Sequence, residues 1–443
     1  MTVLPDRVTR ILTRLRDQGH DAFLVGGCVR DTVLGVTPSD YDIVTDALPD
    51  RVCQLFPDRK VTLAGAAFPV CMVDHVEVAT FRSRSNTEAV AGGLVNDLAR
   101  RDLTVNSMAM DPVSGLITDP FGGQADVRAR IIRFTGSADE RIAEDPCRML
   151  RACRFAVRIR GQLAGSAVDA ICRNRYAVAE VAAERLRAEV EKALAGPKPG
   201  DFFRLLADLD ILSVVFPCLD ACRGIDGGPY HAETLFEHAV LAADAVSAKY
   251  PRLRLAALLH DTGKPAARKV EDGRVTFNGH EKQTRAAEAD LSRLRFSQAD
   301  QRYVIGLIHT HMRPLNENTT DRAVGRLLKA LKDADVDWRD FVRIRIADRR
   351  ANLKKTARSL DEIRGMVRRI RAVLYPASGP SPALTTKDLA VSGADVMQIL
   401  NLRPGPAVGR ILKQLLDTVV DDPSRNTRDQ LKALIEQAAD HDS

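Results

Sequence analysis

Leu24–Asp31 reads LVGGCVRD, and Ser39–Asp42 follows it with SDYD. The apolar residues Ala22–Val25 predict a short strand that ends at a glycine pair, and helical spacing resumes directly after the pair. Glycines between a strand and a helix let the backbone approach a polyphosphate closely, and the N-terminus of the helix favours anions. The stretch therefore predicts a phosphate-binding turn centred on Gly26 and Gly27.

Two aspartates follow this turn on a second apolar segment. Tyr41–Val44 predicts a strand, and alternate residues of a strand point to one side, so Asp40 and Asp42 are expected to face the same way. Two such carboxylates can hold a pair of Mg²⁺ ions. Glu77, in the apolar segment Val76–Phe81, is the candidate for a third. The alternatives are a solvated loop for the aspartates and a solvent-facing edge for the glutamate.

The predicted secondary structure of the chain changes once, at about Phe134. Before Phe134 short helices alternate with apolar segments, and Val70–Val73 with Val76–Phe81 predicts a hairpin. After Phe134 the apolar spacing is helical, with segments such as Glu144–Val157. We expect an α+β chain: a small mixed-sheet head (1–133), a helical neck (134–196), a helical body (197–376) and a helical tail (377–443).

Four further motifs follow in order. They are RRDLTVNSMA at Arg100–Ala109, DPFGG at Asp119–Gly123, EDPCR at Glu144–Arg148 and ERLRAE at Glu184–Glu189. Together with the glycine turn and the two aspartates, this series resembles the class II tRNA nucleotidyltransferase and poly(A) polymerase superfamily. The resemblance implies a Mg²⁺-dependent transfer of nucleotides to an RNA 3′ end, with tRNA, CTP and ATP as partners.

The resemblance also assigns roles to residues. Arg101 and Asp102 would face the ribose. Asp145 and Arg148, three apart on an expected helix, would imitate a base edge and select CTP and ATP without a nucleic-acid template. An ion pair on the helix surface is the alternative. The implied nucleotide-binding set is Gly26, Gly27, Arg30, Arg101, Asp102, Asn106, Asp145, Arg148 and Arg151.

One segment bears on the product. In the family, the loop between the Glu77 strand and the Arg100 motif governs which nucleotides are added. Here Ser83–Ala99 is seventeen residues long and lacks the tyrosine, aspartate and Arg-Pro pattern of full CCA-adding enzymes. We therefore favour addition of CC over complete CCA, with poly(A) synthesis third. A CC-adding enzyme would require a separate A-adding enzyme on the same tRNA.

A second constellation lies in the expected body. Ala256–Lys264 reads AALLHDTGK and, with His238 and Asp348, resembles the HD superfamily of metal-dependent phosphohydrolases. The implied ligands of a divalent metal, additional to Mg²⁺ in the head, are His238, His260, Asp261 and Asp348, and His280, His309 and His311 are candidates for another ion. The body could instead keep only the shape of such a domain, or phosphohydrolysis could be the main activity.

Charge and cysteine usage complete the expectations. The formal net charge is +6, and Arg343–Arg371 holds eleven Arg and Lys against three acids. This basic segment suits a phosphate backbone, and a solvated helix face is the alternative. Eight scattered cysteines, without a CxxC pair or an apolar leader, predict a cytoplasmic protein with reduced thiols and no membrane partner.

Overall fold

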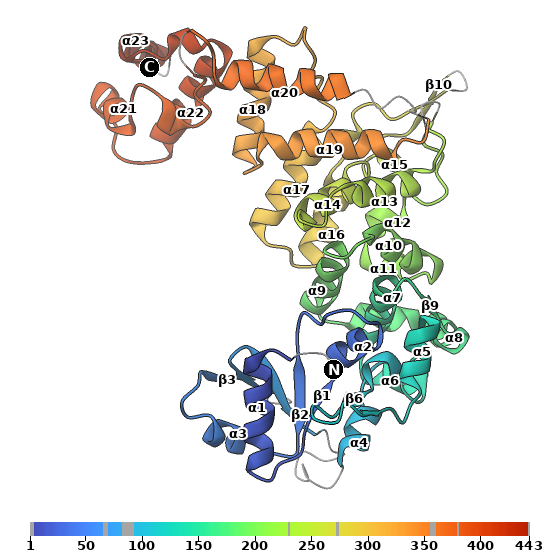
Figure 1. Cartoon of the computed structure of the whole chain (residues 1–443). Coiled ribbons are helices and arrows are strands. Elements are labelled where there is room, and N and C mark those ends of the chain that lie inside the picture. Colours follow the sequence, from blue (N-terminus) through green and yellow to red (C-terminus); the bar gives the residue numbers. More distant parts are fainter. Residues whose placement is uncertain are drawn as a thin grey trace. The chain divides into compact units, whose positions relative to one another are not determined.

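The structure, a computed structural model, describes residues 4–64, 70–81, 93–228, 231–271, 274–354, 360–378 and 381–441. The chain forms two compact units (Figure 1). One comprises Met1–Glu189 and Arg204–Val214, and the other comprises Val190–Phe203 and Val215–Ser443. The α+β prediction is confirmed, because the mixed sheet lies in the first unit and the second is mostly helical. The four predicted domain boundaries stay predictions.

The sheet of the first unit has the order β3-β4-β5-β2-β1-β6-β7. Its strands are β1 (Ala22–Val25), β2 (Asp42–Thr45), β3 (Val61–Ala64), β4 (Val70–Val73), β5 (Val76–Thr80), β6 (Ala109–Met110) and β7 (Ile117–Thr118). The predicted hairpin is confirmed by the antiparallel β4–β5 pair. Strand β2 pairs antiparallel with β1 and parallel with β5, which puts Asp42 directly beside Glu77 in the register.

Short helices accompany this sheet. They are α1 (Asp6–Asp17), α2 (Gly27–Val33), α3 (Pro49–Leu55), α4 (Gly93–Ala99) and α5 (Gly123–Ala129). Helix α1 buries Val8, Ile11, Leu12 and Leu15, an i, i+3, i+4, i+7 stripe that identifies its core face. The helix predicted after the glycine pair is present as α2, but it begins within the pair, at Gly27.

The neck differs from prediction at one point. The single helix expected over Glu144–Val157 is two helices, α6 (Ala138–Glu144) and α7 (Arg148–Arg158). Asp145 between them is extended, with φ −160° and ψ 96°. Pro146 explains the break, because a proline disfavours helical backbone at the residue before it. The expectation that Asp145 and Arg148 share one helix is therefore wrong.

The remaining elements are mainly helical. The first unit also holds α8 (Gly165–Asn174) and a two-residue pair of strands, β8 (Ile131–Ile132) and β9 (Gln162–Leu163). Helices α9 (Ala183–Leu194), α10 (Pro199–Asp208), α11 (Leu212–Val215) and α12 (Pro217–Asp220) follow. The body contains α13 (Leu235–Ala245), α14 (Pro251–Leu259), α15 (Lys264–Ala267), α16 (Arg285–Arg293), α17 (Gln298–Thr310), α18 (Asp321–Asp333), α19 (Trp338–Ala351), α20 (Leu360–Leu374) and the strands β10 (Lys269–Glu271) and β11 (Arg274–Thr276).

The tail has a core of its own. Helices α21 (Gly393–Leu400), α22 (Pro406–Asp421) and α23 (Arg428–His441) bury Val396, Val419, Leu431 and Ile435 together. Within the described ranges, none of the helices has the length and apolarity needed to cross a membrane.

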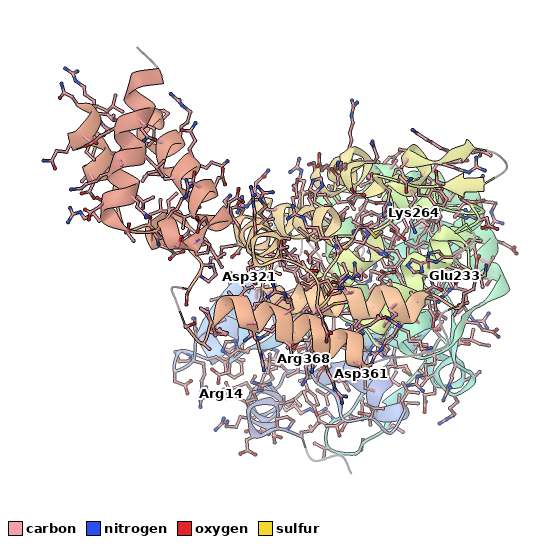
Figure 2. The ribbon with its side chains drawn as sticks, turned by 90° about the horizontal axis from the view of Figure 1, so that it is seen from above. Arg14, Glu233, Lys264, Asp321, Asp361 and Arg368 are labelled. Atoms are coloured by element: carbon pink, nitrogen blue, oxygen red, sulfur yellow. The ribbon has the colours of Figure 1, made fainter. Side chains whose placement is uncertain are left out.

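Five arginines of the basic segment Arg343–Arg371 form ion pairs in the part of the segment that the structure describes. Figure 2 labels Asp321, Asp361 and Arg368, which lie on α18 and α20. The ion pairs are Arg343–Asp340, Arg349–Glu362, Arg364–Asp361, Arg368–Glu317 and Arg369–Asp321. These acids offset part of the positive charge of the segment. Its binding to a phosphate backbone stays a prediction, with a solvated helix face as the alternative.

Candidate active site

The first unit gathers carboxylates at the start of β2. Asp42 opens the strand, Glu77 lies beside it on β5, and Asp40 precedes it. Burial and the negative charges of Glu77 and Asp40 raise the pKa of Asp42 to about 6, and the positive charge of Arg101 opposes them. The negative charge of a partly buried carboxylate beside two others is poorly compensated, and a bound divalent cation would compensate it. The donor set therefore fits the predicted metal site.

Asp40 needs a different argument from the one that sequence alone provides. The expected strand Tyr41–Val44 begins one residue later, at Asp42, so strand alternation does not set the direction of Asp40. Its negative charge nevertheless contributes to the raised pKa of Asp42, so the two carboxylates are close enough to interact. The Ser39 hydroxyl donates to Asp40 Oδ2 at 3.0 Å.

The glycine turn adjoins this acidic centre. Gly26 has φ 72°, a left-handed conformation that favours glycine, and it immediately precedes α2. A methyl group placed on Gly26 would lie 3.3 Å from Arg101 Nη1 and 3.7 Å from Asp42 Oδ2. The turn, the arginine and the aspartate therefore meet at one place, and a side chain at Gly26 would crowd it.

Arg30 and Asn106 belong to a buried network next to this centre. Arg30 is 2% exposed and donates through Nε and Nη2 to Asp31 Oδ1, at 2.9 and 2.7 Å, and through Nη1 to Asn106 Oδ1 at 2.8 Å. Asn106 in turn lies 3.5 Å from Asp102 Oδ1. These contacts make Arg30 a support of the motif, and its expected nucleotide contact stays a prediction.

Helix α7 carries an arginine stripe that joins head to neck. Residues three or four apart share one face of a helix. The four pairs along this face are Arg148–Glu144 at 2.6 Å, Arg151–Asp102 at 2.7 Å, Arg154–Glu189 at 2.6 Å and Arg158–Asp31 at 3.2 Å. Burial opposes ionisation of Asp102, but Arg151 and the Leu103 amide more than compensate and lower its pKa.

Asp145 and Arg148, the expected base-selecting pair, form hydrogen bonds to other residues of the neck. Arg185 Nη2 donates to Asp145 Oδ2 at 2.6 Å, and the Cys147 amide donates to Asp145 Oδ1 at 3.2 Å. Arg148 Nη1 donates to Glu144 and to the Arg141 carbonyl. Base selection by Asp145 and Arg148 stays a prediction, and nucleotide binding would have to compete with these contacts.

The second unit brings the predicted histidines and aspartates together. Asp261 lies at the centre, with its carboxylate oxygens 3.3 Å from His260 Nε2 and 3.1 Å from His280 Nε2. Asp348 is 110 residues from His238 in sequence, yet its Oδ1 lies 3.1 Å from His238 Nε2. His311 Nε2 is 3.6 Å from Asp261. His309 is exposed and bonds the Glu281 carbonyl, so it does not belong to this cluster.

Three of the imidazoles turn Nε2 towards Asp261 and Nδ1 towards a backbone carbonyl. The Nδ1 atoms of His260, His280 and His311 lie 2.7 to 2.9 Å from backbone carbonyls, which assigns the protons to Nδ1 and leaves Nε2 towards Asp261. His260 Nε2 is buried without a hydrogen-bond partner. A histidine that binds a metal through one ring nitrogen usually donates the N–H of the other to a backbone carbonyl or carboxylate, as here. The residues therefore fit a divalent metal held by His238, His260, Asp261 and Asp348.

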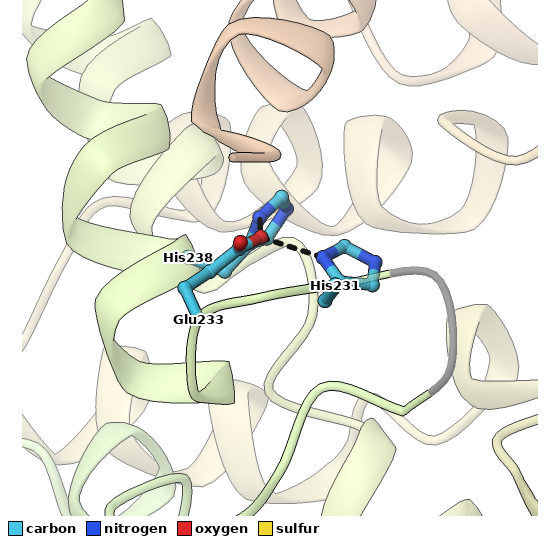
Figure 3. Close-up of side chains that lie close together, drawn as sticks. All are labelled: His231, Glu233 and His238. Carbon is cyan, nitrogen blue, oxygen red and sulfur yellow. Dashed lines mark hydrogen bonds and ion pairs between the residues drawn. The ribbon is translucent and has the colours of Figure 1, made fainter. Parts of the chain in front are cut away.

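Glu233 holds His238 from the other side (Figure 3). Its Oε1 accepts from Nδ1 of both His231 and His238, at 2.7 and 3.0 Å. Its Oε2 accepts from the Leu353 amide at 3.0 Å, just beyond the end of α19, which carries Asp348. Burial disfavours a charge on His238, but hydrogen bonds to Asp348 and Glu233 raise its pKa to about 9. A metal would have to replace that proton.

Sequence reasoning missed three of these residues. Glu233 lies five residues before His238, and this spacing gave no signal for a pair. Asp31 was quoted only as part of the glycine motif. Asp97 lies four residues before Arg101 and pairs with it, but it falls in the segment Ser83–Ala99, which was expected to be a loop, so the spacing was not interpreted as a helical ion pair.

Three family models match the chain. The Poly A polymerase head domain matches residues 22–133, an RNA and SrmB-binding site of polymerase A matches 162–223, and tRNA nucleotidyltransferase domain 2 matches 277–435. The first of these spans the glycine turn, the carboxylates and the Arg101 motif. Together with the site geometry, it defines the class as nucleotidyltransferases with a poly(A) polymerase-type head.

Relatives narrow this class. The A-adding tRNA nucleotidyltransferase of Deinococcus radiodurans is 31% identical over 89% of this chain and 91% of that enzyme. The CC-adding tRNA nucleotidyltransferase of Thermus thermophilus is 32% identical over 90% of this chain and 89% of that enzyme. The CCA-adding enzyme of Geobacillus kaustophilus is 39% identical, but the match spans 46% of this chain and 52% of that enzyme. The chain belongs to the class II tRNA nucleotidyltransferase family.

A solved structure agrees with this assignment. The crystal structure of the Bacillus stearothermophilus CCA-adding enzyme in complex with CTP covers 99% of both chains, with a TM-score of 0.66 and 26% identity. The likeness spans the head, neck, body and tail, which supports the α+β architecture over the whole chain.

Proposed function

We propose that the chain adds cytidine nucleotides from CTP to the 3′ end of tRNA. The observation that carries the proposal is the meeting of the Gly26 turn, Arg101 and the carboxylates of Asp42 and Glu77. The near full-length similarity to the A-adding and CC-adding enzymes supports tRNA as the acceptor.

The chemistry is a phosphoryl transfer. The RNA 3′-hydroxyl attacks the α-phosphorus of the nucleotide, the bond from that phosphorus to the bridging oxygen breaks, and pyrophosphate leaves. Asp40 and Asp42, with Glu77 beside them, would hold Mg²⁺. Bound there, the ions would lower the pKa of the hydroxyl and offset the charge of the leaving group. The glycine turn would receive the triphosphate. Arg101 was expected to face the ribose, but its Nη1 lies beside Gly26 and Asp42, so we propose that it contacts the triphosphate instead.

The product is proposed as CC, with a separate enzyme supplying the terminal A. The segment on which this rests, Ser83–Ala99, lies outside the described residues up to position 92. The two full-length relatives carry names that denote partial additions, and this supports a split activity without deciding which half. Complete CCA addition and poly(A) synthesis are the other outcomes of the test.

A gel assay separates these outcomes. Labelled tRNA lacking CCA and labelled tRNA ending in CC are each incubated with Mg²⁺ and with CTP alone, ATP alone or both. Extension by two nucleotides, with no further growth when ATP is added, supports CC addition. Extension by three refutes it in favour of complete CCA. A long ladder with ATP points to poly(A), and extension only of tRNA that already ends in CC points to A addition.

A second activity is proposed for the body, namely metal-dependent phosphohydrolysis at His238, His260, Asp261 and Asp348. The convergence of imidazole Nε2 atoms on the buried carboxylate of Asp261 and the half-buried carboxylate of Asp348 supports it, since such a donor set suits a transition metal. The test is hydrolysis of bis-p-nitrophenyl phosphate and of 2′,3′-cyclic nucleotides with Mn²⁺, Ni²⁺ or Mg²⁺. Loss of turnover in Asp261→Asn would support the activity, and no turnover with any of these metals would refute it.

A further inference from the structure

The two edges of the Arg101 guanidinium face different groups. Its Nε and Nη2 atoms both lie 3.0 Å from Asp97 Oδ2. Its remaining nitrogen, Nη1, lies on the side of Gly26 and Asp42, 3.3 Å from where a Gly26 methyl group would be. One edge of the arginine is therefore held by Asp97, and the other faces the proposed triphosphate and metal positions.

Asp97 is placed to hold that arginine firmly. It lies near the end of α4, and its residue is 1% exposed, while the Arg101 side chain is 13% exposed. A buried carboxylate needs a cationic or hydrogen-bonding partner, and an arginine fork supplies one with fixed geometry. The pair therefore restricts the guanidinium far more than an exposed ion pair would.

Without Asp97, the Arg101 guanidinium would have a second carboxylate within reach, that of Asp42. Asp42 Oδ2 and Arg101 Nη1 flank the same point at Gly26, at 3.7 and 3.3 Å. A released guanidinium could turn its fork onto Asp42, because arginine binds a carboxylate best with two nitrogens. Such a pair would occupy the lone pairs that Asp42 needs for a metal ion.

We propose that Asp97 is a positioning residue that keeps the Arg101 guanidinium turned to the glycine turn, leaving Asp42 free for the metal and Nη1 free for a nucleotide phosphate. This inference rests on the proposed nucleotidyl transfer and adds to it a residue that no motif contains. Asp97 acts through Arg101 and does not itself touch the substrate.

The test compares Asp97→Asn with a matched control, Asp126→Asn. Asp126 is also buried on a short helix of the same unit and also binds an arginine, with Arg133 Nε and Nη2 at 3.2 and 3.4 Å. The structure gives Arg133 no contact with Gly26 or Asp42 within the described part of the chain. Both substitutions remove one buried carboxylate charge, so a general loss of stability affects both.

The readouts are the Mg²⁺ concentration for half-maximal CMP incorporation, kcat, and the KM values for CTP and tRNA. For Asp97→Asn we expect the half-saturating Mg²⁺ concentration to rise about fivefold or more, with a lower kcat and an unchanged KM for tRNA. For Asp126→Asn we expect these values within twofold of the parent protein. In an Arg101→Met background, Asp97→Asn should have no further effect, since no guanidinium remains to misplace.

Three results would overturn the inference: an unchanged Mg²⁺ requirement in Asp97→Asn, an equal change in Asp126→Asn, or independent effects in the double variant. If Asp97→Asn does not fold, Asp97→Glu replaces it, because the longer side chain keeps the buried charge but displaces the carboxylate that holds the Arg101 fork, and a rise in the same direction is expected. Equilibrium binding of CTP with Mg²⁺ needs no turnover. Weaker binding in Asp97→Asn alone would support the inference even if transfer itself were refuted.

Discussion

The carboxylate of Asp42 should destabilise the metal-free protein at neutral pH. Its pKa rises from 3.8 to about 6 on folding because of burial, Glu77 and Asp40, with Arg101 in opposition. Between these two values the folded state keeps a proton that the unfolded chain releases, so stability falls as the pH rises through this window. A difference of this size corresponds to about 3 kcal/mol above pH 6, as an upper limit.

Asp42→Asn removes this penalty and retains the size of the side chain. In EDTA at pH 7.5 the variant should unfold at a higher temperature, by about 2–4 °C for each kcal/mol recovered in a unit of this size. Near pH 4 the gain should disappear, because Asp42 is then protonated in the parent protein too. Calorimetry is the suitable assay, since the single tryptophan, Trp338, lies in the second unit.

Mg²⁺ provides the matching control. It should raise the unfolding temperature of the first unit in the parent protein, because an ion that binds the folded state alone stabilises it, and have little effect on that unit in Asp42→Asn. A variant no more stable than the parent in EDTA at pH 7.5, or equally stabilised at both pH values, would refute the reasoning about this carboxylate.

Three further outcomes are expected. Asp42→Ala should abolish nucleotide incorporation and leave tRNA affinity, measured by gel shift, nearly unchanged; residual transfer near the parent rate would contradict the metal assignment. Arg151→Met should lower stability by about 1–3 kcal/mol in denaturant titration, because buried Asp102 loses its arginine, whereas an unchanged midpoint would count against a stabilising role for that pair. Glu233→Gln should weaken Mn²⁺ or Ni²⁺ binding in the body about 10- to 100-fold by calorimetric titration; equal affinity would show that His238 needs no such support.

Much of the local structure could be predicted from the sequence. The strand, glycine pair and helix at Ala22–Val33 were predictable because the apolar period and the glycines act within a few residues. The hairpin that carries Glu77 followed from its β-branched residues. The break at Asp145 was equally local, since Pro146 disfavours helix there, and it was missed because the surrounding apolar spacing looked continuous.

Only the tertiary structure decided which distant groups meet. The parallel pairing of β2 with β5 sets Glu77 beside Asp42, and no turn connects those strands directly. Asp348 reaches His238 across 110 residues, and Glu233 bonds the Leu353 amide across 120. A sequence fixes backbone preferences over a turn or two of chain, but a buried charge takes whichever partner packing brings within 3 Å, and that depends on the whole core.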